Sequence, residues 1–309
     1  MKNIKYKYQL NNLLVSFIIF LVISDSLIGQ DLEPRFLSPA PVGMNFVLLA
    51  YGYSVGNVLL DQSIPLEDTE AKMNSIAVGF ARSINLFGFS GRIQAALPFA
   101  TATWFAELNG IDSSTTRTGI GDPLIALAVD FIGAPALKAK EFINYKRKTI
   151  LGLGLKVRVP IGQYNSEKFF NLGSNRWIIY TRLGLSQKIG RFVLEGYINA
   201  FLFTTNTNFY GGNKVEQDPV FSAQIHVTYL FSNGIWAAVS FGQNYGGAVG
   251  VNDEPKKNIQ SNNRFGVALS IPILSNFGIK LAFTTGTSTR YGADFDTIVA
   301  AFQYRWGGI

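Results

Sequence analysis

The sequence predicts an all-β protein, a transmembrane antiparallel β-barrel of about twelve strands with short periplasmic turns and longer outer loops. Three observations predict this fold: long segments that alternate apolar and polar residues, connections that alternate between short and long, and an export signal at the N-terminus. Strands of soluble proteins usually have about five or six residues. Segments of roughly 10–15 residues with period-two patterning fit tilted strands that cross a bilayer.

The N-terminus has the order of a secretory signal peptide. MKNIKYKYQLNN carries three lysines, LLVSFIIFLVIS is an apolar run, and DSLIGQ is a polar exit. The apolar run is short for a membrane-spanning helix. We therefore predict a signal peptide over residues 1–30, cleaved near Gly29 or Gln30; an uncleaved anchor is the alternative.

Composition excludes several other functions. The 309 residues contain no cysteine, so a disulfide, a thiolate metal site and a lipid-anchored cysteine are all excluded. The net charge of +7 could suggest nucleic acid, but the cations are scattered along the chain and the chain is predicted to be exported. We expect a protein of the Gram-negative outer membrane, with no nucleic-acid partner.

The predicted barrel occupies residues 44–306. Its twelve strands, in order, are 44–54, 71–83, 90–99, 121–131, 149–160, 176–187, 191–204, 218–231, 235–245, 262–272, 277–288 and 294–306. An even number of strands places both barrel termini on one side of the membrane.

The connections between these strands give a second, independent pattern. Tight turns such as KIG and FSNG alternate with long polar loops such as GGAVGVNDEPKKNIQS. This alternation is typical of outer-membrane barrels. Two connections depart from it: IGAPALKAKEFINYKRK is long on the short side and predicts a short periplasmic helix after Pro135, and STRYGA is short on the long side.

The strand ILGLGLKVRVP, residues 150–160, shows how the faces divide. Its leucines lie on one face, whereas Gly152, Gly154, Lys156 and Arg158 lie on the other. We expect Leu153 and Leu155 to face lipid, and Gly154→Arg to be tolerated better than arginine at either leucine if space allows. A soluble sandwich would give the same parity, but the strand length, the loop alternation and the signal favour a barrel.

Charges inside the other strands follow the same rule. The predicted lumen-lining residues, which are candidates for a substrate path, are Arg92, Asp130, Lys156, Arg158, Arg182, Glu195, Gln224, His226, Arg264, Lys280 and Arg305. Seven of the nine charged members are basic, so the lumen should be electropositive, with Glu195 and Asp130 paired to cations. These charges could attract anions, or they could form a structural ladder that fills a narrow lumen.

Residues 31–43 precede the first strand and form a candidate plug. Three prolines prevent regular strand pairing. Apolar residues such as Phe36 favour burial, and Glu33 and Arg35 offer polar contacts to a charged wall.

Catalytic and nucleotide-binding motifs are weak. His226 is the only histidine, and Ser222 on the same face lies about 13 Å along the strand, too far for proton transfer. RTGIGDP lacks the ending of a phosphate loop; we expect a loop that re-enters the sheet, with Gly119 and Gly121 permitting tight backbone and Asp122 accepting hydrogen bonds from loop amides. We predict no enzyme activity, cofactor or metal site.

Several stretches, in order, resemble one known family. They are DLEPRFLSPAPVGMNF (31–46), STTRTGIGDPLIAL (114–127), IGAPAL (132–137), NLGSNRW (171–177), LEGY (194–197), QDPVFS (217–222), QSNNRFG (260–266) and FQYRW (302–306). Together they resemble the transporter-like outer-membrane barrels of the meta-pathway phenol-degradation family. The resemblance implies a barrel fold and at most the uptake of an aromatic or other hydrophobic compound, and it transfers no catalytic or ligand residues. Barrels of this kind usually end on an aromatic residue, whereas here Gly307, Gly308 and Ile309 follow Trp306.

The function predicted from the sequence is a channel or facilitator for a small, aromatic or hydrophobic solute. A non-conducting structural or partner-binding envelope barrel is the alternative, and an outer-membrane lipid hydrolase is a distant third. The expected partners are outer-membrane lipids, the barrel assembly machinery and the solute.

Overall fold

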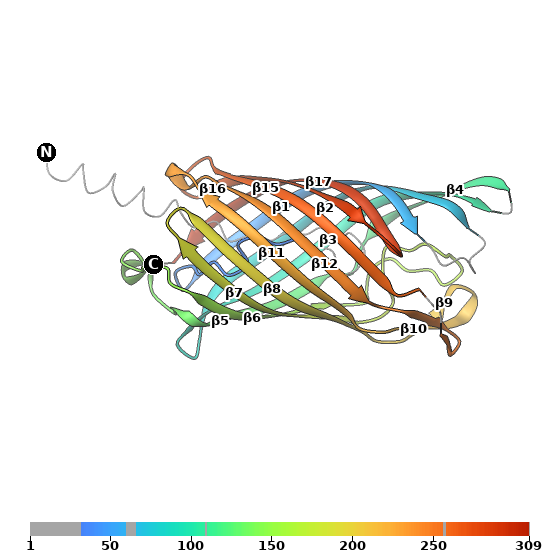
Figure 1. Ribbon diagram of the computed structural model, residues 1–309, viewed down its shortest axis with the longest axis horizontal. Helices are drawn as coiled ribbons and strands as arrows, with labels where there is room; N and C mark the ends of the chain where they lie inside the picture. The colour runs from blue at the N-terminus through green and yellow to red at the C-terminus, as the bar shows by residue number, and fades with distance from the viewer. Residues whose placement is uncertain (1–31, 60–65, 109, 256–257, 309) are drawn as a thin grey trace, which may run out of the picture.

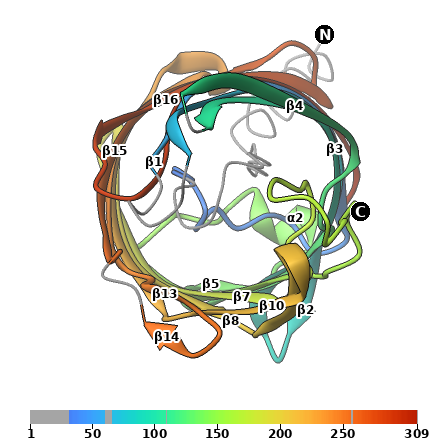
Figure 2. The ribbon, with the colours of Figure 1, turned by 90° about the vertical axis from the view of Figure 1, so that its right-hand side faces the viewer.

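The structure is a computed structural model that describes residues 32–59, 66–108, 110–255 and 258–308. Within these residues, twelve strands close into one antiparallel barrel, because β1 pairs with β17 and β2 while β3 pairs with β2 and β5 (Figures 1 and 2). The barrel strands are β1 (Met44–Leu59), β2 (Glu67–Leu86), β3 (Phe89–Leu108), β5 (Leu124–Pro135), β6 (Ile150–Arg158), β7 (Ile178–Ile189), β8 (Phe192–Phe203), β11 (Val220–Leu230), β12 (Trp236–Gly246), β15 (Gln260–Pro272), β16 (Phe277–Ser288) and β17 (Gly292–Gly307). The predicted fold class is confirmed.

The two ends of the barrel differ as the connections predicted. One end, here called the turn end, carries the short connections 87–88, 190–191, 231–235 and 273–276. The other, the loop end, carries the long connections 159–177, 204–219 and 247–259 (Figure 1). Met44 and Gly307 pair across β1 and β17 at the turn end, so the barrel begins and ends on the same side.

Secondary structure outside the barrel was only partly predicted. The expected helix after Pro135 is the single turn α2 (Ala139–Phe142) at the turn end; η2 (Ser232–Gly234) also lies at this end. Strand β4 (Ile111–Ile120), which extends a hairpin with β3, was not predicted. Nor was a four-stranded loop sheet next to η1 (Tyr210–Gly212), which consists of β9 (Asn206–Phe209), β10 (Asn213–Gln217), β13 (Val249–Val251) and β14 (Glu254–Pro255). These strands are short or lie on polar loops, where period-two patterning is weak. Among the described helices, none has both the length and the apolar composition needed to cross a membrane.

The outer face of the barrel is apolar. On β6, Leu153 and Leu155 are 48% and 43% exposed, whereas Gly152, between Leu151 and Leu153, is buried. Leu153 pairs with Leu183 of β7, and Leu155 pairs with Leu127 of β5, so exposed leucines continue across neighbouring strands. An apolar surface that surrounds a barrel is the lipid-contacting band of a membrane protein.

Leu155→Arg should weaken folding into a bilayer by about 2–4 kcal/mol near the midplane, because it places a cation on the lipid face. The measurement is the free energy of folding in lipid vesicles from a urea titration. Leu155→Met is the control and should fold like the wild type. Equal stability of the two variants would show that Leu155 does not contact lipid.

Candidate functional site

The predicted lumen residues all lie on the face of the wall opposite the exposed apolar side chains. Eight are buried, namely Arg92, Asp130, Arg182, Glu195, Gln224, His226, Arg264 and Lys280. Lys156, Arg158 and Arg305 are partly buried. The interior is therefore polar and carries an excess of positive charge.

Residues 32–43, here called the plug segment, lie inside this polar interior. Residues 32–41 are buried throughout, and the segment crosses the lumen in Figure 2. At the turn end, Val42 N donates to Leu137 O (2.9 Å) and Gly43 N donates to Ser83 O (3.0 Å). The plug segment is thus fixed to the barrel where β1 begins, and it reaches inward from there.

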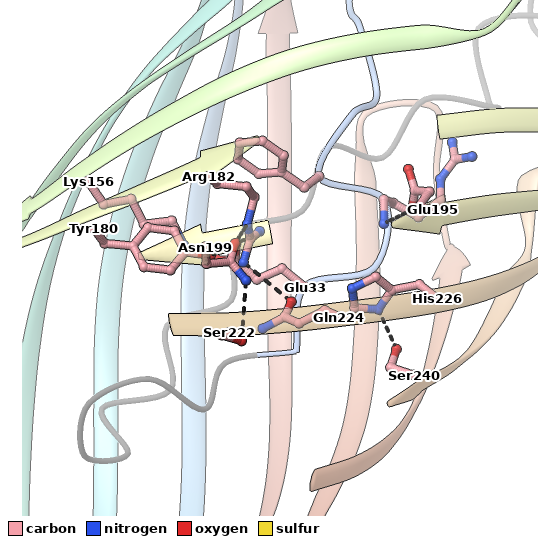
Figure 3. A network of polar contacts seen from close by, with 12 residues as sticks. Glu33, Lys156, Tyr180, Arg182, Glu195, Asn199, Ser222, Gln224, His226 and Ser240 are labelled. Atoms are coloured by element: carbon pink, nitrogen blue, oxygen red, sulfur yellow. Dashed lines mark hydrogen bonds and ion pairs between the residues drawn. The ribbon is translucent and has the colours of Figure 1, made fainter. Parts of the chain in front are cut away.

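Glu33 anchors the inner part of the plug segment. Its carboxylate forms ion pairs with Lys156 and, at 2.5 Å, with Arg182 (Figure 3). Burial alone would raise the pKa of Glu33, but the positive charges of Lys156 and Arg182 outweigh burial and lower it to about 2. Glu33 is therefore ionised at physiological pH, and the buried cations of the wall keep their counterion.

Arg182 is the centre of the polar network in the wall. Its Nε donates to Asn199 Oδ1 at 2.8 Å, and the hydroxyl of Tyr180 donates to the same oxygen at 2.7 Å. The guanidinium lies 4.8 Å from the ring centroid of Phe36 and 4.8 Å from that of Tyr197. The aromatic rings shield the cation without neutralising it, so Glu33 supplies the compensating charge.

Glycines in the wall make room for the apolar side chains of the plug segment. A Cβ atom on Gly154 would lie 2.6 Å from Cζ of Phe36, and one on Gly242 would lie 2.8 Å from Cδ2 of Leu32. Gly152 and Gly184 approach Leu37 in the same way. These inward glycines form notches that the plug segment fills.

The condition of free space, on which the prediction for Gly154→Arg depended, is therefore not met. The position faces the lumen as predicted, but the ring of Phe36 already occupies the space. Face assignment follows from the strand period alone, whereas free volume depends on the plug segment.

Glu195 holds the middle of the plug segment through a residue outside the strands. Its Oε2 accepts a hydrogen bond from Arg35 N at 2.6 Å, and its Oε1 lies 3.4 Å from Arg147 Nη2. Arg147 also donates to Leu37 O at 2.8 Å. Glu195 was expected to pair with a cation, but Arg147 was not predicted as its partner, because that residue lies in the connection after α2. Among the described ion pairs, none involves Asp130.

His226 contacts a serine that strand spacing could not identify. Its Nδ1 lies 2.7 Å from Ser240 Oγ, across the β11–β12 pair. The Oγ of Ser222 instead lies 3.4 Å from Asn199 Nδ2, which donates to it. His226 and Ser240 are 1% and 3% exposed, so the pair is enclosed in the wall.

The RTGIGDP motif, through Asp122, holds two loops together at the loop end. Asp122 Oδ1 accepts from Gly162 N (3.0 Å), and Oδ2 accepts from Ser174 N (2.8 Å). Gly121 lies in the connection to β5, but Gly119 lies in strand β4, which corrects the loop expected there. Asp122 thus joins the β4–β5 connection to the long loop after β6.

In the described chain, no group of three or more His, Asp or Glu side chains is arranged to hold a metal ion.

A closed twelve-stranded barrel with an apolar outer band and a charged lumen defines an outer-membrane type β-barrel. The sequence model of the family described as "Putative MetA-pathway of phenol degradation" matches residues 61–302, and the chain belongs to this family. No curated protein sequence matches the chain significantly.

Two solved structures show the same fold. The chain is similar to an outer membrane channel from Pseudomonas putida F1, with 17% identity and a TM-score of 0.75 over 89% of this chain and 100% of that one. It is also similar to the beta domain of the Bordetella autotransporter BrkA, with 9% identity and a TM-score of 0.50 over 86% of this chain and 100% of that one.

Gly154→Leu should displace the plug segment, because its side chain would occupy the space of the Phe36 ring. The measurement is labelling of Ser38→Cys by a membrane-impermeant maleimide, in a chain that has no other cysteine. Ser38 is fully buried, so labelling should rise several-fold when the plug segment is displaced. The matched control is Gly196→Leu, since a Cβ atom there meets nothing within 4 Å; equal labelling in both variants would contradict the notch assignment.

Proposed function

We propose that this protein is an outer-membrane channel that admits a small solute and is closed at rest by its plug segment. The observation that carries the proposal is the way the plug segment is seated. Glu33, Phe36 and Leu37 hold it through side-chain contacts, and it belongs to no strand of the sheet. It can therefore leave without breaking a single strand pairing of the wall.

The charge of the lumen favours anions in the open state. Seven of the nine charged residues predicted for the lumen are basic. When the plug segment leaves, the carboxylate of Glu33 leaves with it, and Lys156 and Arg182 lose their counterion. Rings of cationic side chains select anions or the anionic ends of solutes.

The family description supports the class of solute, and one structural neighbour supports the channel. The description of the family names phenol degradation, and one structural neighbour is described as an outer membrane channel. We propose an aromatic or hydrophobic solute, carried toward the turn end, which faces the periplasm. The proposal includes removal of residues 1–30 as a signal peptide, cleavage near Gly29 or Gln30, and insertion by the barrel assembly machinery.

A non-conducting structural barrel is the second candidate. The observation that favours it is the density of buried contacts around Arg182, which could hold the plug segment permanently. Lipid hydrolysis is not proposed, because Ser240 and His226 are enclosed in the wall rather than open to a substrate.

Deleting residues 31–42 should raise the conductance of the barrel in planar bilayers and the antibiotic sensitivity of cells, without preventing assembly. The reason is that the deletion removes the plug segment except Gly43 and leaves all the strands. The deletion also removes the carboxylate of Glu33. Glu216→Gln is the control for the loss of an acidic charge, because Glu216 is exposed in the loop sheet and lies outside the lumen.

The reversal potential of the deletion variant under a salt gradient should show preference for anions. Neutralising Lys156 and Arg158 in the same variant should reduce that preference. If the deletion variant assembles normally and conducts like the wild type, the structural barrel is the better account.

A further inference from the structure

A cavity of about 470 Å³ opens at the turn end, between the plug segment, the α2 connection and the barrel wall. Its apolar lining includes Met44, Phe46 and Phe142. Its polar lining is basic and includes Arg35 and Arg147, and no acidic residue among the described ones lines it. A cavity of this volume lies within the range of about 300–1,000 Å³ that small-molecule sites occupy.

Arg35 contributes a cation without a bound partner at two of its nitrogens. Arg35 is 3% exposed, and its Nε and Nη1 atoms have no hydrogen-bond partner. Its backbone has a φ of 71°, in the left-handed region that residues with a side chain rarely adopt. The hydrogen bond from Arg35 N to Glu195 holds this conformation. Strained, buried and unpaired groups of this kind concentrate at binding sites.

The surroundings of Arg35 increase its need for an anion. Burial and, to a smaller extent, the nearby positive charge of Arg147 lower the pKa of Arg35, Glu195 opposes them, and the resulting pKa is about 9. Glu195 is already engaged by Arg35 N and by Arg147. Lys146 and Lys188 add two exposed cations at the rim. One carboxylate therefore does not balance the positive charge of the site.

We propose that this cavity binds a carboxylate that carries a short apolar body, with the guanidinium of Arg35 as the ligand for the carboxylate. A planar guanidinium matches a carboxylate in two parallel hydrogen bonds. The apolar body lies against Phe46 and Phe142, away from the basic rim. The inference rests on the proposed channel function for its purpose, since it names the solute class held at the inner mouth.

The experiment measures equilibrium binding of 4-fluorobenzoate to the full chain in detergent micelles by ¹⁹F NMR, corrected with protein-free micelles. The neutral analogue 4-fluorobenzyl alcohol tests the need for the carboxylate, and inorganic phosphate as competitor tests the need for the apolar body. We expect saturable binding of 4-fluorobenzoate, weak binding of the alcohol and little displacement by phosphate. Conductance plays no part in this measurement, so a failure here leaves the channel proposal standing.

Arg35→Gln should weaken binding at least about tenfold, as expected for a lost charged hydrogen bond. Ile143→Glu, which places a negative charge in the lining without touching the plug segment, should do the same if Arg35→Gln alters folding. The matched control is Arg191→Gln, an exposed arginine at the same end, which should bind like the wild type. Unchanged binding in both variants, equal binding of the alcohol, or ready displacement by phosphate would overturn the proposal.

Discussion

The ion pairs of Glu33 with Lys156 and Arg182 are the interaction on which the position of the plug segment inside the barrel depends. The wall turns its cations inward because lipid surrounds the outside, and the completely buried guanidinium of Arg182 needs a negative charge beside it. That charge comes from the plug segment and not from a neighbouring strand. The same ion pairs therefore hold the plug segment in position and compensate the positive charge of the wall. Water could replace Glu33 around these cations only if the lumen opened.

The inward glycines complete this arrangement sterically. A β-strand that faces lipid on one side could carry side chains of any size on the other, yet β6 places Gly152 and Gly154 toward the lumen. Leu37 and Phe36 fill the space that larger wall residues would occupy. The plug segment belongs to no strand, so these contacts use none of the hydrogen bonds that pair the strands of the wall. The proposed opening of the channel requires such a packing, because it exchanges a packed interior for a hydrated one without unpairing strands.

The barrel could be predicted from the sequence because two determinants of this fold, the strand period and the turn residues, are local. Strand period and turn chemistry act over a few residues, so β16 was predicted at its observed bounds, 277–288, and the single-turn helix after Pro135 was expected. Contacts between distant segments were harder to predict. Strand parity gives the face of Gly154 but not the presence of Phe36 against it, and it gives the face of His226 but not Ser240 across the strand pair. Arg147 was missed because it lies in a connection, where no period indicates a direction. Strand β4 was not predicted because it is rich in threonine and serine, a composition that resembles that of a loop.

The most direct test of the central claim is to lock the plug segment in place. The chain has no cysteine, so the pair Leu32→Cys and Gly242→Cys would be the only thiols, placed where Cδ2 of Leu32 lies 2.8 Å from a Cβ atom on Gly242. Single-channel conductance would be recorded with the disulfide formed and after reduction, with the covalent state confirmed by mass spectrometry. If the plug segment closes the channel, the channel stays closed when the pair is oxidised and shows opening events when it is reduced. Equal conductance in the two states, with the disulfide present, would contradict it.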